Sequence, residues 1–472
     1  MLSVKKATKF AVANLIIVST VFSSVTPAIA QSDKSSKDES FAVGNTKNPK
    51  NVIFLVGDGM GPSFNTAYRY YKNDPHAKEM TPTAFDSYLK GTNRTYSNDP
   101  KQNITDSAAG GTAFSSGHKT YNGAIGVDSN KQKVKTVLER AKEKGKSTGL
   151  VSTAELTDAT PAAYAAHVTS RDDKNEIAKQ FYKDKINGKH KVDVLLGGGA
   201  KYFGKSNGNL DKKFKKDGYD LATNSKELSK SDKDKVLGLF ADKNMPLAID
   251  ASKDEPSLAD MQQSALSKLE RNKKGFFLMV EGASIDKSAH SNDITGVMSE
   301  MEGFEKAFDD AIQYAKKHKD TLVVATADHS TGGLTIGKDK GYEWNPQPIK
   351  SMKHSGSYMT EKMAKGEDPE KVINEGYGFE FSQDDMKKVK KENKKLKRLL
   401  KKDEKSADVE KQTKALQHAI QKPVNDKSYT GWTSDGHTGE DVNTYAYGPR
   451  SESFSGNIEN TESAKIIFDI FK

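Results

Sequence analysis

Acids and histidines of this chain follow apolar segments in a pattern that suits cation binding. Three segments of strand length run into such residues: Val52–Val56 into Asp58, Phe276–Val280 into Glu281, and Leu322–Ala325 into Asp328 and His329. Ligands of open α/β sheets bind beyond the carboxyl ends of the strands, so these side chains can converge there. A single aspartate after a strand is more often a turn or helix-cap residue. A set delivered to one sheet edge predicts a shared site.

The spacing of the remaining candidates adds possible ligands. Asp286 and His290 are four residues apart, so on a helical turn both project from one face and can hold one cation. Adjacent residues such as Asp328 and His329 can both reach one ion where the backbone turns at a strand end. His437 is expected on a glycine-flanked loop that can present a ligand. The other histidines lack acidic partners at comparable spacing and are interpreted as structural or solvated: His76, His118, His167, His190, His318, His354 and His418.

A serine with small neighbours is a candidate nucleophile. In Thr105-Asp106-Ser107-Ala108-Ala109-Gly110-Gly111-Thr112, the small residues after Ser107 allow helix entry and close packing. A helix N-terminus offers free N–H groups and partial positive charge, which favour an anionic substrate or an ionised oxygen. Taken alone, the segment favours a simple helix cap. It is not a Gly-x-Ser-x-Gly elbow, which disfavours an esterase, and the chain carries no Walker-type phosphate loop.

These residues need a scaffold of strands and helices. Five apolar runs have strand length: Val52–Val56, Gly149–Ser152, Val192–Leu196, Phe276–Val280 and Leu322–Ala325. Apolar runs without alternation indicate strands buried on both faces, and therefore parallel strands. Amphipathic stretches lie between them, and the clearest has one apolar helical face: Val297, Met301, Phe304, Phe308 and Ile312. The order predicts an α/β fold with a doubly wound, mostly parallel central sheet flanked by helices and a peripheral inserted subdomain.

Composition excludes several classes of protein. The chain has 472 residues, 74 Lys+Arg, 64 Asp+Glu and no cysteine. Without cysteine there is no disulfide scaffold, thiolate zinc site or cysteine nucleophile, so a metal must be held by His, Asp, Glu or hydroxyl groups. Hydrophobic residues make up only 34%, which excludes a polytopic membrane protein.

The first residues have the pattern of an export signal. Lys5, Lys6 and Lys9 precede the apolar run 10–22, and small residues at Ala28 and Ala30 suit a signal peptidase. Residues 1–30 are therefore predicted to be a cleavable signal peptide rather than an integral membrane anchor; a buried N-terminal helix is the alternative. A flexible lead-in over 31–48 and a catalytic domain over 49–472 are expected to follow. The protein is then secreted or envelope-associated, and periplasmic if its source has an outer membrane.

Two stretches lack the alternation of predicted strands and helices. They are predicted to be a polar insertion near 205–235 and a lysine-rich peripheral insertion near 340–429. Within the second, residues 387–402 hold ten basic residues and one acid. Apolar residues at helical spacing predict an amphipathic helix there, with a lysine face. A solvated face is the simpler interpretation; docking to an anionic cell-wall polymer is the alternative. No nucleic-acid fold motif accompanies the lysines, so specific nucleic-acid binding is not expected.

Three motifs occur together: Thr-Asp-Ser-Ala-Ala-Gly-Gly-Thr-Ala from 105, Thr-Ala-Glu-Leu-Thr-Asp-Ala-Thr-Pro from 153, and Glu-Gly-Ala-Ser-Ile-Asp-Lys from 281. With them the chain resembles the bacterial alkaline phosphatases. With Asp158 and Lys287 at these two places, the chain resembles the two-zinc, one-magnesium subtype rather than relatives that carry histidine there. The chain departs from many periplasmic relatives in lacking their disulfides.

The resemblance implies two zinc ions and one magnesium ion. The implied ligands are Asp286, His290 and His437 for a first zinc; Asp58, Asp328 and His329 for a second; and Asp58, Thr160 and Glu281 for magnesium, which Asp158 reaches through water. The implied substrate-side residues are the nucleophile Ser107, Arg171 clamping two phosphoryl oxygens, Asp106 steadying Arg171, and Lys287 contacting phosphate through water.

The activity that the resemblance implies is hydrolysis of small phosphomonoesters through a phosphoserine, with release of inorganic phosphate, by a homodimer. A secreted phosphodiesterase of the same superfamily is the main alternative; such relatives usually lack the Arg171 clamp and the magnesium ligands. A sulfatase would need a maturation motif that this sequence lacks. A non-enzymatic wall-binding protein is a further alternative, but it would not explain why every implied metal ligand is present.

Overall fold

A ten-stranded sheet lies at the centre of the described chain, which in this computed structural model comprises residues 47–472 without Pro75, Lys340 and 403–405. The expected signal peptide and most of the lead-in lie outside these residues. In spatial order the strands are β16 (Gly456–Glu459), β2 (Leu89–Arg94), β15 (Val442–Tyr447), β10 (Thr321–Thr326), β1 (Asn51–Gly57), β9 (Phe276–Gly282), β3 (Ser147–Glu155), β6 (Val194–Gly198), β8 (Val236–Leu239) and β7 (Asp220–Ala222). From β10 to β7 every pair is parallel, and β15 is antiparallel to both neighbours. The predicted mostly parallel α/β sheet is confirmed.

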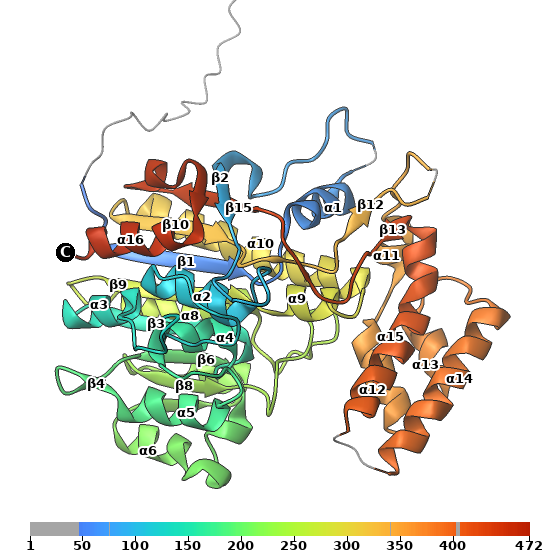
Figure 1. Cartoon of the computed structure of the whole chain (residues 1–472), viewed down its shortest axis with the longest axis horizontal. Coiled ribbons are helices and arrows are strands. Elements are labelled where there is room, and N and C mark those ends of the chain that lie inside the picture. Colours follow the sequence, from blue (N-terminus) through green and yellow to red (C-terminus); the bar gives the residue numbers. More distant parts are fainter. Residues whose placement is uncertain (1–46, 75, 340, 403–405) are drawn as a thin grey trace, which may run out of the picture. The chain divides into compact units, whose positions relative to one another are not determined.

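Strand β1 shows why these apolar runs become central strands. Ile53 and Leu55 enter one hydrophobic core, whereas Val52, Phe54 and Val56 enter the other, and all five are fully buried. A strand buried on both faces needs an unbroken apolar run, because successive side chains point to opposite faces. Helices contribute to each core (Figure 1). The core that contains Ile53 includes side chains of α1 (Pro62–Lys72), α8 (Leu258–Leu269) and α10 (Ile294–Lys317). The core that contains Val52 includes side chains of α2 (Ser107–Ser116), α3 (Val137–Glu143), α4 (Ala159–Ala165), α5 (Lys174–Lys183), α6 (Leu210–Lys216) and α16 (Asn460–Ile470).

The strand register brings the polar ends of three strands to one edge. Val56 of β1 lies opposite Glu281 of β9 and Thr326 of β10, so Asp58 leaves the sheet beside Glu281 and near Asp328. Gly59 then turns the chain with a φ of +72°, and a Cβ there would lie 2.9 Å from the Cα of Asp286. Only glycine combines that backbone conformation with so close an approach. The turn after β1 is therefore tied to the helix that follows β9.

The segment 205–235, expected to be a polar insertion, contributes to the main sheet. It contains α6, the edge strand β7 and α7 (Ser225–Ser229). Leu210, Phe214 and Tyr219 are buried among its lysines and join the second core. Three well-spaced apolar residues are enough to anchor the segment, although its overall composition is polar.

The segment 340–429 is helical. Its helices are α11 (Gln347–Ser351), α12 (Gly356–Ala364), α13 (Pro369–Gly376), α14 (Gln383–Leu400) and α15 (Ala407–Lys427), and α12 to α15 pack on one another (Figure 1). Helix α14 is the predicted lysine-rich amphipathic helix, with Val389 and Leu396 buried. Helix α10 likewise follows its predicted apolar face, and Asp293 caps it by accepting from the Gly296 N–H. None of the helices in the described ranges is both long enough and apolar enough to cross a membrane.

Short elements complete the fold. Three two-stranded sheets pair β4 (Lys185–Ile186) with β5 (Lys189–His190), β11 (Ser330–Thr331) with β14 (His437–Thr438), and β12 (Thr335–Ile336) with β13 (Thr430–Gly431). Helix α9 (Ser284–Ala289) is a short turn after β9, and four 3₁₀ turns occur in the described ranges: Asp86–Tyr88, Ala200–Tyr202, Lys205–Asn207 and Ser451–Phe454.

A buried ion cluster at α3 makes a testable contribution to stability. Glu139 forms a capping box with Thr136 and accepts from His167 Nε2 and Lys191 Nζ, both at 2.8 Å. Burial alone would raise the pKa of Glu139, but His167 and Lys191 lower it to about 2. This carboxylate therefore stabilises the fold above its ordinary pKa of 4.5, and the contribution is lost as pH falls through the folded pKa.

We expect Glu139→Gln to lower the free energy of unfolding by about 3 kcal/mol at pH 7, since one pKa unit corresponds to ~1.4 kcal/mol. The difference from the parent protein should shrink as pH falls from about 5 toward 2. Denaturant unfolding at several pH values measures it. Glu143→Gln removes a half-exposed glutamate from the same helix and should change stability by about 0.5 kcal/mol or less. Equal effects of both changes at pH 7 would contradict the assignment.

Candidate metal centre and active site

The first group of candidate ligands comprises Asp286, His290 and His437. Asp286 lies on α9 and His290 directly after it, and their side chains approach to 3.3 Å. His437 Nε2 lies 3.6 Å from Asp286 Oδ1 and 3.2 Å from His290 Nε2. One ligand atom from each residue falls within 4.8 Å of the others. The predicted pairing of residues four apart thus gains a third member from a distant segment.

Backbone carbonyls orient both imidazoles of this group. His290 Nδ1 donates to the Asp435 carbonyl at 2.5 Å, and His437 Nδ1 donates to the Thr105 carbonyl at 2.9 Å. With the hydrogen assigned to Nδ1, each Nε2 carries a lone pair, and the two lone pairs face each other. That arrangement is repulsive unless a cation or a proton lies between them. The geometry fits a divalent metal ion.

The structure corrects the expected position of His437. Instead of a glycine-flanked loop, His437 lies in β14, where it pairs with Thr331 of β11. Strand β11 directly follows Asp328 and His329, so this short ladder places His437 beside them. The rings of His329 and His437 stack with centroids 3.5 Å apart. Burial lowers the pKa of both histidines to about 4, so each ring is neutral at pH 7 and able to bind a metal.

The second group comprises Asp58, Asp328 and His329, all buried. His329 Nε2 lies 3.3 Å from Asp328 Oδ2 and 3.6 Å from Asp58 Oδ1. Neither of those two carboxylate oxygens accepts a hydrogen bond from any described residue. Buried polar atoms are normally paired, so unpaired carboxylate oxygens beside an imidazole point to a missing partner. Carboxylate oxygen and imidazole nitrogen are ordinary zinc ligands.

The pKa values of the buried acids also indicate that cations bind here. Burial, reinforced by Asp328 and Asp286, raises the pKa of Asp58 well above its ordinary value. Burial and Asp286 raise the pKa of Asp328 to about 6, and burial raises that of Glu281 to about 7. Ionising these groups together without compensation is unfavourable. Divalent cations supply the compensation, so the residues present fit the metals that the sequence implies.

A third set of oxygens lies at the ends of β1, β3 and β9. Glu281 accepts from Ser152 Oγ at 2.5 Å, and Thr160 on α4 has a buried hydroxyl without a partner among the described residues. Asp158 caps α4 by accepting from the Ala159 N–H. Oxygen-only donors suit magnesium, which usually keeps waters in its coordination sphere. The third set therefore fits magnesium better than zinc.

Ser107 lies beside the second ligand group. It is the first residue of α2, buried, with Asp106 as the helix cap accepting from the Ala109 N–H. Its Oγ is 3.2 Å from His329 Nε2, although 222 residues separate them in sequence. Asp106 supplies the helix cap that the motif predicts, and the nucleophile interpretation of Ser107 stays a prediction. The N-terminus of a helix favours negative charge, because its free N–H groups carry partial positive charge.

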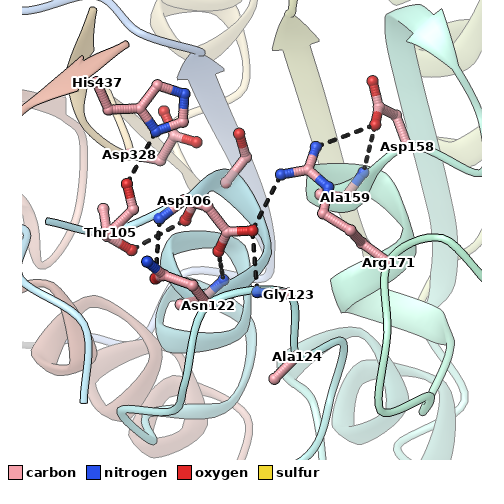
Figure 2. A network of polar contacts seen from close by, with 12 residues as sticks. Thr105, Asp106, Asn122, Gly123, Ala124, Asp158, Ala159, Arg171, Asp328 and His437 are labelled. Atoms are coloured by element: carbon pink, nitrogen blue, oxygen red, sulfur yellow. Dashed lines mark hydrogen bonds and ion pairs between the residues drawn. The ribbon is translucent and has the colours of Figure 1, made fainter. Parts of the chain in front are cut away.

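Figure 2 shows how Arg171 is held. Its guanidinium donates to Asp106 Oδ2 at 3.1 Å and to Asp158 Oδ1 at 3.3 Å. Lys287 donates to the other oxygen of Asp158 at 2.8 Å. Although burial opposes it, Lys287 and Arg171 lower the pKa of Asp158 below its ordinary value. Arg171 is therefore fixed on two sides, by Asp158 and by Asp106, the residue that precedes Ser107.

Several supporting residues were not found from the sequence. Asn122 accepts from the Asp106 N–H at 3.1 Å (Figure 2). It also donates to the Ile104 carbonyl at 2.9 Å. Thr331 Oγ1 donates to Asp286 at 2.6 Å and lies 3.3 Å from His329 Nδ1, linking the two ligand groups. No signal in a single sequence marks such isolated polar residues, because they act through contacts between distant segments.

Asn122 holds the short segment that carries Thr105 and Asp106, and the segment borders a cavity of about 520 Å³. The cavity is lined by Gln102, Asn103, Ile104, Thr105, Asp106, Asn122, His290 and His437. It adjoins the first ligand group through His290 and His437. Asn122 therefore positions both the Asp106–Arg171 pair and the hydrogen bond from His437 to Thr105.

We expect Asn122→Ala to lower kcat/KM for a phosphomonoester about tenfold, because supporting hydrogen bonds of this kind typically contribute ~10–100-fold. Steady-state kinetics measure it. The effect should be smaller in an Arg171→Ala background, since both changes act on one network. Asn98→Ala is the control: Asn98 is an exposed asparagine that bonds Ser129, and its loss should leave kcat/KM unchanged. A tenfold loss that persists in the Arg171→Ala background would contradict this role.

Several histidines outside the site have acidic partners from distant segments. His167 contacts Glu139, His190 contacts Asp217 and His354 contacts Asp250, at 2.8 to 3.0 Å. His418 lies 3.3 Å from Asp435, whose carbonyl orients His290. These pairs are structural contacts that sequence spacing does not reveal.

Comparison with known proteins covers almost the whole chain. The family model described as Alkaline phosphatase matches residues 49–472. Alkaline phosphatase 3 of Bacillus subtilis is 49% identical over 464 residues, which cover 98% of this chain and 96% of that protein. Alkaline phosphatase 4 of the same organism is 48% identical over 426 residues, covering 90% and 89%. The crystal structure of a cold-active alkaline phosphatase from Shewanella sp. matches with a TM-score of 0.80 at 37% identity, covering 89% of this chain and 100% of the other. The chain therefore belongs to the alkaline phosphatase family and is a phosphomonoester hydrolase.

Proposed function

We propose that the protein hydrolyses phosphomonoesters through a phosphoserine formed on Ser107. The observation that carries this proposal is the position of the Ser107 hydroxyl: at the N-terminus of α2, 3.2 Å from His329 and beside two groups of metal-type ligands. The Ser107 hydroxyl gives up its proton and its oxygen attacks phosphorus in line. The bond from phosphorus to the alcohol oxygen breaks, and that oxygen takes up a proton and leaves as the alcohol. Water then hydrolyses the phosphoserine and releases inorganic phosphate.

The chain's own groups bind and orient the phosphoryl group. Arg171, held by Asp106 and Asp158, offers two parallel N–H donors that match two phosphoryl oxygens, a geometry that lysine lacks. Helix α2 adds the N–H groups of its first turn. The site is buried around Ser107, which strengthens these charge interactions.

Two zinc ions and one magnesium ion are the metals that we assign to the site. Asp286, His290 and His437 would hold one zinc, and Asp58, Asp328 and His329 the other. Thr160 and Glu281, with Asp58, would hold magnesium, while Asp158 and Lys287 act through water. When bound, the metals supply Lewis-acid stabilisation of charge on the attacking and leaving oxygens. The support is the donor chemistry, the unpaired buried oxygens and the raised pKa values of the acids.

Monoesterase and diesterase activities are separated by one comparison. The parent protein should turn over p-nitrophenyl phosphate far faster than bis(p-nitrophenyl) phosphate, because a diester presents one fewer charged oxygen to Arg171. Arg171→Ala should lose activity mainly toward the monoester. Comparable rates on both substrates would favour the phosphodiesterase alternative.

Export and assembly complete the proposal. We propose cleavage after Ala30 and release to the outside of the membrane, followed by assembly as a homodimer. Amino-terminal sequencing of the exported protein should begin at Gln31, and light scattering after size exclusion should give twice the chain mass. An uncleaved amino terminus or a monomer mass would overturn the corresponding part.

A further inference from the structure

Helix α14 presents a row of cations to a hollow in the protein surface. The hollow has a volume of about 400 Å³ and is lined by Lys390, Lys394, Lys397, Arg398 and Lys401 on α14, together with Asn393 and with Asp368 and Pro369 at the start of α13. The five cations follow the spacing i, i+4, i+7, i+8 and i+11, so they share one helical face. At a rise of 1.5 Å per residue the row is about 16 Å long.

Four cations of α14 are neutralised by acids, whereas four of the five cations that line the hollow are not. Lys387 pairs with Asp384, Lys388 with Asp385, Lys390 with Glu370 and Lys395 with Glu392. Among the described residues, Lys394, Lys397, Arg398 and Lys401 have no acidic partner. Like charges three and four residues apart destabilise a helix. An anion in the hollow would relieve this repulsion.

Asn393 adds a second, uncharged feature to the same hollow. It is only 3% exposed, and its Oδ1 accepts no hydrogen bond from a described residue. A buried amide oxygen without a partner is a vacant acceptor for a hydroxyl group. The hollow therefore combines a row of unpaired cations with one hydroxyl acceptor.

We propose that this hollow binds a linear phosphodiester polymer whose repeating units carry free hydroxyl groups. Regular negative charges along a chain match a row of cations along a helix, and the hydroxyls match Asn393. A polymer fits better than a membrane surface, because none of the large hydrophobic side chains exposed in the described ranges lies on α14. The contact is independent of catalysis and would retain the enzyme on a polyanionic support.

The test uses the exported, metal-loaded protein and poly(glycerol phosphate) as the probe. Lys394→Gln, Lys397→Gln and Lys401→Gln together should raise the Kd at least tenfold at 0.15 M salt. The matched control, Lys387→Gln, Lys388→Gln and Lys395→Gln, removes the same charge from neutralised positions of the same helix and should raise the Kd less than twofold. Both variants should hydrolyse p-nitrophenyl phosphate at the parent rate, which separates this proposal from the catalytic one.

Two further measurements distinguish the nature of the ligand. The parent protein should prefer poly(glycerol phosphate) over inorganic polyphosphate, because polyphosphate has no hydroxyl groups along its chain. Asn393→Ala should remove this preference. The variant should still bind polyphosphate, which would show that it is folded. Equal weakening by the two triple variants would overturn the proposal in favour of diffuse charge attraction. Binding to phosphatidylglycerol vesicles without binding to the polymer would overturn it in favour of a membrane surface.

Discussion

Replacement of Ser107 by alanine is expected to abolish the phosphoenzyme and to lower kcat by at least about 10³-fold. The Ser107 oxygen is the group placed at the N-terminus of α2 and 3.2 Å from His329. Asp106, which caps the helix, is unchanged in the variant, so the fold is expected to persist. Incubation with ³²P-labelled phosphate followed by an acid quench measures the phosphoenzyme directly.

A second serine of the same helix is the control for Ser107. Ser116 donates to the Thr112 carbonyl at 2.7 Å and faces the helix backbone rather than the site. Ser116→Ala should therefore label and turn over like the parent protein, with at most a small loss of stability. Undiminished labelling of Ser107→Ala would show that another group is the nucleophile and would overturn the proposed chemistry.

Removal of divalent metals is expected to abolish activity and to lower the melting temperature by several degrees. Without cations, the buried carboxylates of Asp58 and Asp328 lose their compensation, and each then favours a proton. A ligand at 1,000 times its Kd stabilises a fold by about 4 kcal/mol, and each of the proposed metal sites would contribute in this way. Dialysis against EDTA, with calorimetry and rate measurements before and after zinc and magnesium are restored, tests both effects.

The thermal measurement does not depend on catalysis, which allows a further control. Ser107→Ala keeps all of the proposed metal ligands, so chelation should cost it as much thermal stability as the parent protein. Asp328→Asn with His329→Ala removes one ligand group and should respond less to chelation. Full turnover of a sample shown to be metal-free would refute the metal assignment, whereas a smaller thermal effect in Ser107→Ala would indicate that Ser107 itself helps to hold a metal.

Local patterns allowed much of the fold to be predicted. The runs at 52–56, 276–280 and 322–325 form central parallel strands because an apolar run without alternation can only be buried on both faces. The pair Asp286 and His290 was predictable because residues four apart meet on any helical turn.

Other features could not be predicted from local patterns. Segment 205–235 joins the sheet through a few apolar residues hidden in a lysine-rich composition. His437 reaches the site because β14 pairs with β11, a contact between segments more than 100 residues apart. Asn122 and Thr331 have roles that exist only through their folded neighbours.

By itself, then, the sequence determined the types of the reactive groups, most of the strands and helices that carry them, and the family, because these depend on periodicity and motifs within short stretches. Only the tertiary structure decided that Ser107, His329 and His437 meet, and which imidazole nitrogens remain free to bind a cation. The hydrogen bond from His437 to Thr105 spans 332 residues, and the contact between Ser107 and His329 spans 222. Such contacts follow from sheet order and the packing of loops, which no local pattern encodes.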